Sequence, residues 1–135
     1  MDRNKINELI ETAEKARQKS YAPYSGFTVG AALLCDDGSI YEGVNIENAS
    51  YPVGICAERA AFSAAVSDGK RNFSAIAIVG GHAGKSADEP CCPCGICRQF
   101  MSELCGGDLC VISAASTEKY SLNTLSELLP FAFEL

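Results

Sequence analysis

The chain has 135 residues, of which 47% are hydrophobic and 21% are charged, and its formal net charge is −6. This size suits one domain with one substantial core, so we expect a single domain over residues 1–135 and exclude a multidomain protein. Lys and Arg are not clustered, which argues against nucleic-acid polymers and anionic membranes as partners, because both require concentrated positive charge. No export signal and no apolar run of about 20 residues is found, so we expect a cytoplasmic protein that does not cross a membrane.

The first half of the chain predicts a helix followed by a hairpin. Residues 3–19 carry apolar side chains at the three- and four-residue spacing of one helical face, which predicts an amphipathic helix. Residues 27–35 predict a buried strand, and residues 39–46 predict its partner. Asp37 and Gly38 lie between them as a turn, so we expect the two strands to be antiparallel.

Helices and strands alternate in the next part of the chain. The alanine-rich residues 56–69 predict a helix of about three turns, and the apolar residues 74–80 predict a strand. A second helix is predicted to begin at residue 93 or 94 and to stop at Gly106. Residues 109–115 then predict another strand.

The end of the chain completes the predicted architecture. A short strand is predicted near Lys119 and Tyr120, and Thr124 with Glu127 forms the capping box of a last helix through Leu129. Strands joined through helices imply parallel neighbours with helices covering the sheet. We therefore predict an α/β fold, a three-layer α/β/α sandwich with a mixed sheet of about five strands.

Four of the eight cysteines fall within the segment CCPCGIC. In a cytosolic chain such clustering favours metal binding or catalysis over disulfides. Cys94 and Cys97 lie three residues apart at a helix start, so both sulfurs can hold one tetrahedral ion. Cys56, at the start of the other helix, would supply a third thiolate and leave the fourth position open, as in catalytic zinc sites. The irregular residues 81–93 precede this cluster, and we expect them to form the rim of the site.

Glu58 follows Cys56 by two residues and is placed to touch whatever fills the open position. A C-x-E triplet is common by chance, whereas P-C-x-x-C is rare, and the two in this order match the signature of zinc deaminases. In such a hydrolysis Glu58 would take a proton from the activated water, pass it to ring N3 and then serve the departing amine. Three thiolates weaken the acidifying power of zinc, and we assign Arg59 the role of compensating them by hydrogen bonds.

Structural interpretations of the same residues remain open. Cys94 and Cys97 also suit a redox C-x-x-C motif, or a closed structural Cys₄ zinc site completed by Cys91 or Cys92. Arg98 is either a surface charge or a second support for the thiolates. The single histidine, His82, is expected to face solvent and to have no role in the site. Three further cysteines are expected to be small buried hydrophobic residues: Cys35 and Cys110 in apolar strands, and Cys105 at a helix end.

Four segments of the chain resemble the small, homotetrameric, zinc-dependent cytidine deaminases, and the resemblance covers nearly the full length. They are YAPYSGFTVGAALL, GVNIENASYPVGICAERAAF, PCGICRQFMSEL and LLPFAF. The resemblance implies hydrolytic deamination of cytidine and deoxycytidine to uridine and deoxyuridine with release of ammonia, in pyrimidine salvage. It also implies one Zn²⁺ per subunit on the three cysteines named above, with Glu58 as the proton shuttle.

The resemblance further implies how a pyrimidine nucleoside is bound. Phe27 packs on the pyrimidine, Asn45 and Glu47 hold the ribose hydroxyls, and Ala57 belongs to the same substrate site. The resemblance implies that Tyr51 and Phe133 complete the site of an adjoining subunit. Phe131, near the C-terminus, is expected to be exposed as they are. We therefore expect a homo-oligomer, a tetramer by resemblance.

Three other functions compete with this one. They are deamination of a cytosine-containing antibiotic such as blasticidin S, a zinc-stabilised interaction module without catalysis, and an editor of polynucleotides. The acidic charge disfavours the editor. The ribose-holding pair Asn45 and Glu47 favours free nucleosides as substrates, and so does Arg59, which directly follows Glu58.

Overall fold

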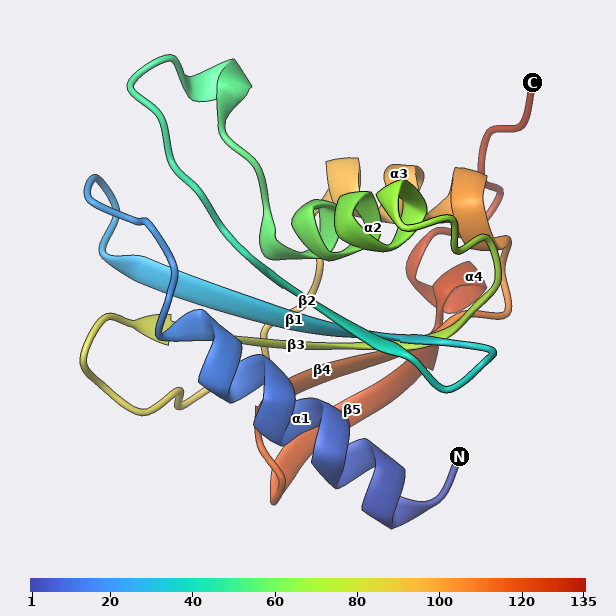
Figure 1. Ribbon diagram of the computed structural model, residues 1–135, viewed down its shortest axis with the longest axis horizontal. Helices are drawn as coiled ribbons and strands as arrows, with labels where there is room; N and C mark the ends of the chain where they lie inside the picture. The colour runs from blue at the N-terminus through green and yellow to red at the C-terminus, as the bar shows by residue number, and fades with distance from the viewer.

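A five-stranded mixed sheet lies in the middle of the molecule, with helices on both of its faces (Figure 1). The computed structural model describes residues 1–135. Its elements in chain order are α1 (Arg3–Arg17), β1 (Phe27–Cys35), β2 (Ile40–Val44), the 3-10 helix η1 (Tyr51–Val53), α2 (Ala57–Ser67), β3 (Phe73–His82), α3 (Gly95–Cys105), β4 (Cys110–Ser116), β5 (Lys119–Thr124) and α4 (Leu125–Leu128).

The strand order across the sheet is β2-β1-β3-β4-β5. The one parallel pair is β3 with β4, in the register Ala75 opposite Cys110, and α3 provides the crossover between these two strands. The other three pairs are antiparallel, including the predicted hairpin of β1 and β2. The predicted mixed sheet in a three-layer α/β sandwich is confirmed.

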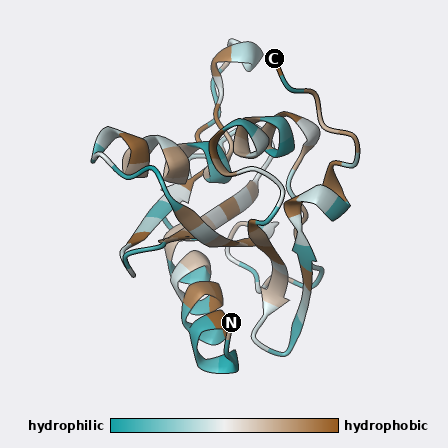
Figure 2. Ribbon diagram, turned by 90° about the vertical axis from the view of Figure 1, so that its right-hand side faces the viewer, coloured by the Kyte–Doolittle hydropathy of each residue, from teal (hydrophilic) through white to brown (hydrophobic).

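Two separate apolar cores lie on the two faces of the sheet. Helix α1 packs on one face through the apolar residues of its predicted stripe: Ile6, Leu9, Ile10, Ala13 and Ala16. Helices α2, α3 and α4 pack on the other face. Figure 2 shows α1, beside the N-terminus, with hydrophobic and hydrophilic residues on its turns, as expected for a helix that buries one side. None of the helices is both long and apolar enough to span a bilayer.

The predicted elements agree with the structure apart from their ends. The strand predicted near Lys119 is a six-residue strand, and α3 begins at Gly95 with Cys94 as its N-cap. The predicted capping box is present, because the Thr124 hydroxyl accepts from the Glu127 N–H while the Glu127 carboxylate accepts from the Thr124 N–H.

Gly43 on β2 allows α2 to lie directly against the sheet. A Cβ atom at this position would be 2.3 Å from the Ala57 carbonyl oxygen and 2.3 Å from the Ala61 nitrogen. Only a residue without a side chain permits this approach. The start of α2, which carries Cys56 and Glu58, is thereby held at the edge of the sheet.

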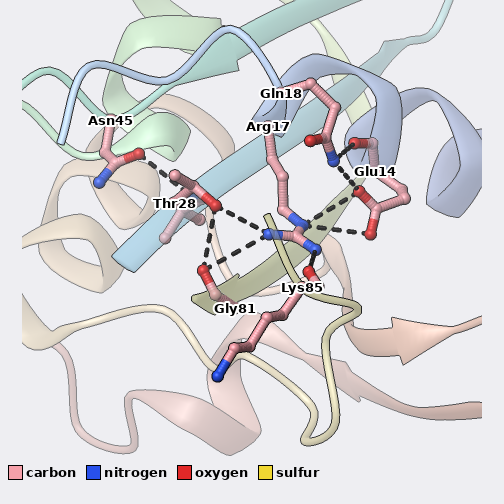
Figure 3. A network of polar contacts seen from close by, with 8 residues as sticks. Glu14, Arg17, Gln18, Thr28, Asn45, Gly81 and Lys85 are labelled. Carbon is pink, nitrogen blue, oxygen red and sulfur yellow. Dashed lines mark hydrogen bonds and ion pairs between the residues drawn. The ribbon is translucent and has the colours of Figure 1, made fainter. Parts of the chain in front are cut away.

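On the opposite face, a buried arginine joins three segments (Figure 3). Arg17, at the end of α1, is 1% exposed. Its Nε donates to the Glu14 carboxylate, its Nη1 donates to Thr28 Oγ1 at 2.8 Å and to the Gly81 carbonyl at 3.4 Å, and its Nη2 donates to the Lys85 carbonyl. These hydrogen bonds fix the end of α1 to the beginning of β1 and to the loop after β3.

Candidate active site

Three thiols from two helix starts converge on the α2 and α3 face of the sheet. Cys56 is the N-cap of α2, Cys94 is the N-cap of α3, and Cys97 lies in the first turn of α3. Their sulfurs all lie within 4.8 Å of one another, with Cys56 and Cys94 at 3.8 Å and Cys94 and Cys97 at 3.5 Å. Sulfurs at about 2.3 Å from a tetrahedral zinc ion lie about 3.8 Å apart, so this thiol cluster fits Zn²⁺.

The electrostatics of the thiol cluster favour its metal-binding form. Hydrogen bonds from the Cys97 thiol, the largest cause, and from the Arg59 guanidinium and the Cys94 thiol together lower the pKa of Cys56 to about 5. Cys97, which keeps its proton in this arrangement, has a pKa above its usual range. Because the thiolate is the form that binds metals, Cys56 is prepared for an ion that displaces the remaining thiol proton.

Arg59 lies beside the thiol cluster. Its Nη2 is 3.6 Å from the Cys56 sulfur, and this contact holds the pKa of Arg59 above its usual range. Its Nε is buried and has no hydrogen-bond partner within the chain. Arg59 therefore keeps one unused donor close to the metal ligands.

Glu58 is the one buried carboxylate of the chain, with 4% of its surface exposed. Burial raises the pKa of this carboxyl, and the charge of Cys56 raises it further. The group of possible metal ligands consists of the three thiols and does not include Glu58. The carboxyl is therefore placed to carry protons beside the metal site.

Cys56 and Cys94 of the thiol cluster border a hollow of about 600 Å³ together with Glu58, whereas Cys97 is fully buried and does not line it. Several residues predicted for the site line this hollow: Asn45, Glu47, Tyr51, Cys56, Ala57, Glu58, Arg59 and Cys94. Sequence reasoning missed other lining residues, namely Tyr24, Ser25, Val29, Ile46, Asn48, Gly54 and Ile55. Those from the turn before β1 could have been suspected because that turn lies within a segment that carries the family resemblance.

Cys91 and Cys92 also line the hollow, but their sulfurs are outside the thiol cluster. The closed Cys₄ site is therefore not formed, and the loop before α3 does border the site as expected. The rest of that loop lies elsewhere, since the Lys85 carbonyl bonds to Arg17 on the other face.

Asn45 and Glu47 already serve the fold. The Asn45 side chain accepts from the Val29 N–H and donates to the Phe27 carbonyl, each at 2.9 Å. The Glu47 carboxylate accepts from the N–H and the hydroxyl of Ser25, and these bonds lower the pKa of Glu47. Asn45 thus ties the end of β2 to β1, Glu47 ties the same segment to the turn before β1, and both residues line the hollow.

Of the three predicted aromatic contacts, Tyr51 lines the hollow and Phe27 and Phe133 do not. Phe27 is 37% exposed and packs edge-to-face on His82, with ring centroids 5.6 Å apart. Tyr51 in η1 lines the hollow and is 80% exposed, whereas Phe133 does not line it and is 70% exposed. Figure 1 shows η1 and the C-terminal segment both extending away from the sheet.

The remaining polar and sulfur-containing residues have structural surroundings. His82 is exposed and outside the ligand group, as expected. Arg98 follows neither interpretation, because its guanidinium donates to the Pro93 carbonyl at 2.8 Å and to the Leu128 carbonyl at 2.7 Å. It thereby fixes the segment before α3 to the end of α4. The three other cysteines are buried or half-buried: Cys35, Cys105 and Cys110.

Comparisons with known proteins agree with this geometry. The family model described as the cytidine and deoxycytidylate deaminase zinc-binding region matches residues 3–113. The cytidine deaminase of Sporosarcina psychrophila is 47% identical over 128 residues, covering 95% of this chain and 90% of that protein. The blasticidin-S deaminase of Bacillus cereus is 30% identical over 93% of this chain and 90% of that protein. A crystal structure of cytidine deaminase from Burkholderia pseudomallei has a TM-score of 0.86 and 45% identity, covering 93% of this chain and 97% of that one.

Proposed function

The chain belongs to the cytidine and deoxycytidylate deaminase family, and on this premise we propose that Glu58 is the proton carrier of its reaction. The protein is a zinc-dependent cytidine deaminase, a hydrolase whose usual role is pyrimidine salvage. One observation carries the residue assignment. Two residues of the thiol cluster, Cys56 and Cys94, and the buried Glu58 border one hollow, and Glu58 lies outside the ligand group.

Cys56, Cys94 and Cys97 would hold Zn²⁺, which would supply acidified water at neutral pH. Glu58 would accept one proton from the water whose oxygen bonds to C4 and would deliver it to N3 of the cytosine ring. It would then accept the proton of the new C4 hydroxyl and pass it to the amine, which leaves as ammonia when the C4–N bond breaks and the C4 carbonyl forms. Burial raises the pKa of Glu58, which suits a group that must both accept and return a proton near neutral pH.

Arg59 offsets the negative charge of the metal ligands. Three thiolates on Zn²⁺ leave a net charge of −1, which opposes the acidification of water. The Arg59 guanidinium lies at 3.6 Å from the Cys56 sulfur. Hydrogen bonds from outside the ligand set tune the metal, and a positive charge at this place withdraws electron density from the sulfur.

The nucleoside is placed by residues of the hollow. Glu47 is ionised, because hydrogen bonds from Ser25 lower its pKa, and a carboxylate can accept further hydrogen bonds from ribose hydroxyls. Asn45 has one side-chain N–H left for the same purpose. Phe27 offers its exposed ring to the pyrimidine, and Ala57 borders the base. We extend the substrate class from cytidine to deoxycytidine.

A homotetramer in the cytoplasm is the form in which we expect the enzyme to act. Exposed aromatic side chains in η1 and in the C-terminal segment support this proposal, because in a single isolated chain these side chains would present apolar surface to water.

Truncation after Pro130 removes Phe133 and should raise KM for cytidine while zinc content stays unchanged. Light scattering that shows a monomer at fully active concentrations would contradict the shared site.

Replacement of Glu58 by Gln tests the proton carrier directly. Zinc content should stay at one ion per subunit, while deamination, followed by ultraviolet absorbance and ammonia release, should fall at least about 10³-fold. Cys56→Ala is the contrasting variant and should lose both zinc and activity. Cys92→Ala should keep its zinc, because its sulfur lies outside the thiol cluster. Loss of zinc in proportion to activity in Glu58→Gln would show that Glu58 is a ligand.

A further inference from the structure

The thiol of Cys91 forms part of the wall of the hollow and has no role in the proposed reaction. Cys91 lines the hollow together with Glu58 and packs against the apolar core on that face. A Cβ atom on Gly80 would lie 2.8 Å from the Cys91 sulfur and 2.9 Å from Cε2 of Phe27. The Cys91 sulfur and the edge of the Phe27 ring therefore both pack against the backbone of Gly80 in β3, where no side chain intervenes.

The environment of this thiol makes it an apolar surface. Burial raises the pKa of Cys91 to about 12, and the charge of Glu58 adds to the shift. A thiol that keeps its proton is neither a nucleophile nor a metal ligand. It behaves as a small hydrophobic side chain, so its contribution to the hollow is its shape.

The reaction determines which part of a cytosine ring comes near this wall. C4 must face the thiol cluster, N3 must face Glu58, and N1 carries the ribose. Cys91 lines the hollow together with Glu58, and its sulfur and the edge of the Phe27 ring lie close together beside Gly80, which places it toward the C4 end of the ring. The positions left at that end are the leaving amine and C5. The amine requires hydrogen-bonding partners, whereas the C5–H edge is apolar and matches a neutral thiol.

We propose that Cys91 determines which substituents the site accepts at C5 of the cytosine ring. The proposal rests on the proposed function. A small side chain at residue 91 leaves room beside C5, and a branched one fills it. Differences of one methylene-sized group in an apolar pocket change selectivity by about 10- to 200-fold.

The test compares kcat/KM for 5-methylcytidine and 5-bromocytidine with kcat/KM for cytidine in three proteins: wild type, Cys91→Ala and Cys91→Val. The ratio of substituted to unsubstituted substrate should rise about tenfold in Cys91→Ala and fall about tenfold in Cys91→Val. The electronic effect of the substituent cancels, because it is the same in every variant. Cys105→Ala is the matched control, since burial also raises the pKa of Cys105 to about 12 and it packs against the same core outside the hollow. Its ratio should equal that of the wild type.

Ratios that stay within about twofold of the wild type in both Cys91 variants, with zinc retained, would overturn the proposal. An equal fall in kcat for all three substrates would also overturn it, because that result assigns Cys91 to the leaving amine. Cys91→Ala alone decides the matter if the valine variant does not fold. A zinc-loaded wild type that fails to deaminate cytidine would instead refute the proposed function, and so the two failures are distinguishable.

Discussion

Two arginines on opposite faces of the sheet differ in how their donors are used. Each nitrogen of the Arg17 guanidinium has an acceptor within the chain, and the side chain is 1% exposed. Arg59 makes one long contact from Nη2 to the Cys56 sulfur, and its buried Nε has no partner. The first arginine is completely paired, whereas the second is only partly paired.

This difference separates a residue that holds the fold from one that serves the reaction. Buried polar groups are normally satisfied, so an unpaired donor beside the metal ligands needs a reason. Arg59 faces a site where negative charge accumulates on the sulfurs, and its spare donor is available there. Arg17 faces neutral carbonyls, a hydroxyl and one carboxylate that are present whenever the protein is folded.

The largest effect is expected from removing the paired charge. Arg17→Met should lower the free energy of unfolding by about 3–5 kcal/mol, because the partners of the guanidinium lose their donor and several of them stay buried. Urea denaturation of the zinc-loaded protein measures this loss. Zinc content of the folded protein should not change.

Arg71→Met is the matched control for this variant. The Arg71 guanidinium also donates to two carbonyls, those of Val66 and Lys70, but on the surface. Its loss should change the free energy of unfolding by less than about 0.5 kcal/mol. If Arg17→Met cost no more than this control, the distinction between the two arginines would be wrong.

Removing the partly paired charge should affect the reaction more than the fold. Arg59→Gln should lower kcat/KM for cytidine about 10- to 100-fold, as is typical when a hydrogen-bond donor to a metal ligand is lost. The free energy of unfolding of the zinc-loaded protein should change by about 1 kcal/mol or less. Steady-state kinetics and denaturation of one preparation test both numbers. If the kinetics were unchanged and the free energy of unfolding fell strongly, Arg59 would hold the fold, as Arg17 does, and would not serve the reaction.

The same contrast shows what the sequence could predict. The stripe of α1, the hairpin and the two helix starts depend on local spacing, and the zinc ligands follow from those helix starts. Arg17 belongs to the predicted helix, but nothing in its neighbours indicates that residues 81 and 85 supply its acceptors. That pairing depends on how α1 lies on the sheet, which local patterns do not define.

Arg98 and Phe27 illustrate two further limits. The sequence does not decide whether Arg98 is a surface charge or a support for the thiolates. Its backbone acceptors, the carbonyls of Pro93 and Leu128, come together only after α3 and α4 pack. Phe27 was assigned to the pyrimidine by family resemblance alone. In the single chain Phe27 does not line the hollow and its ring packs on His82, so its contact with substrate stays a prediction.

A smaller change sharpens the account of Arg17. Thr28→Val removes the hydroxyl that accepts from Arg17 Nη1 at 2.8 Å, while the Gly81 carbonyl remains as a longer acceptor at 3.4 Å. The hydrogen bond that the hydroxyl itself donates to the Gly81 carbonyl at 3.0 Å is lost as well, so the free energy of unfolding should fall by about 1–2 kcal/mol. Thr12→Val on the exposed side of α1 is the control, since its hydroxyl only donates to the Glu8 carbonyl within the helix. Equal losses in the two variants would remove any special role for Thr28.

The smallest expected effect is the coupling between the two faces. Thr28→Val and Arg59→Gln act on hydrogen-bond groups with no shared partner, and the sheet separates the cores on which α1 and α2 pack (Figure 1). Their effects on the free energy of unfolding should therefore add to within about 0.5 kcal/mol in the double variant. Both single variants are mild enough to be measured as folded proteins, so urea denaturation of all four zinc-loaded proteins closes the cycle. A coupling above about 1 kcal/mol would show that the sheet transmits strain from α1 to the start of α2, and the two arginines would then belong to one network.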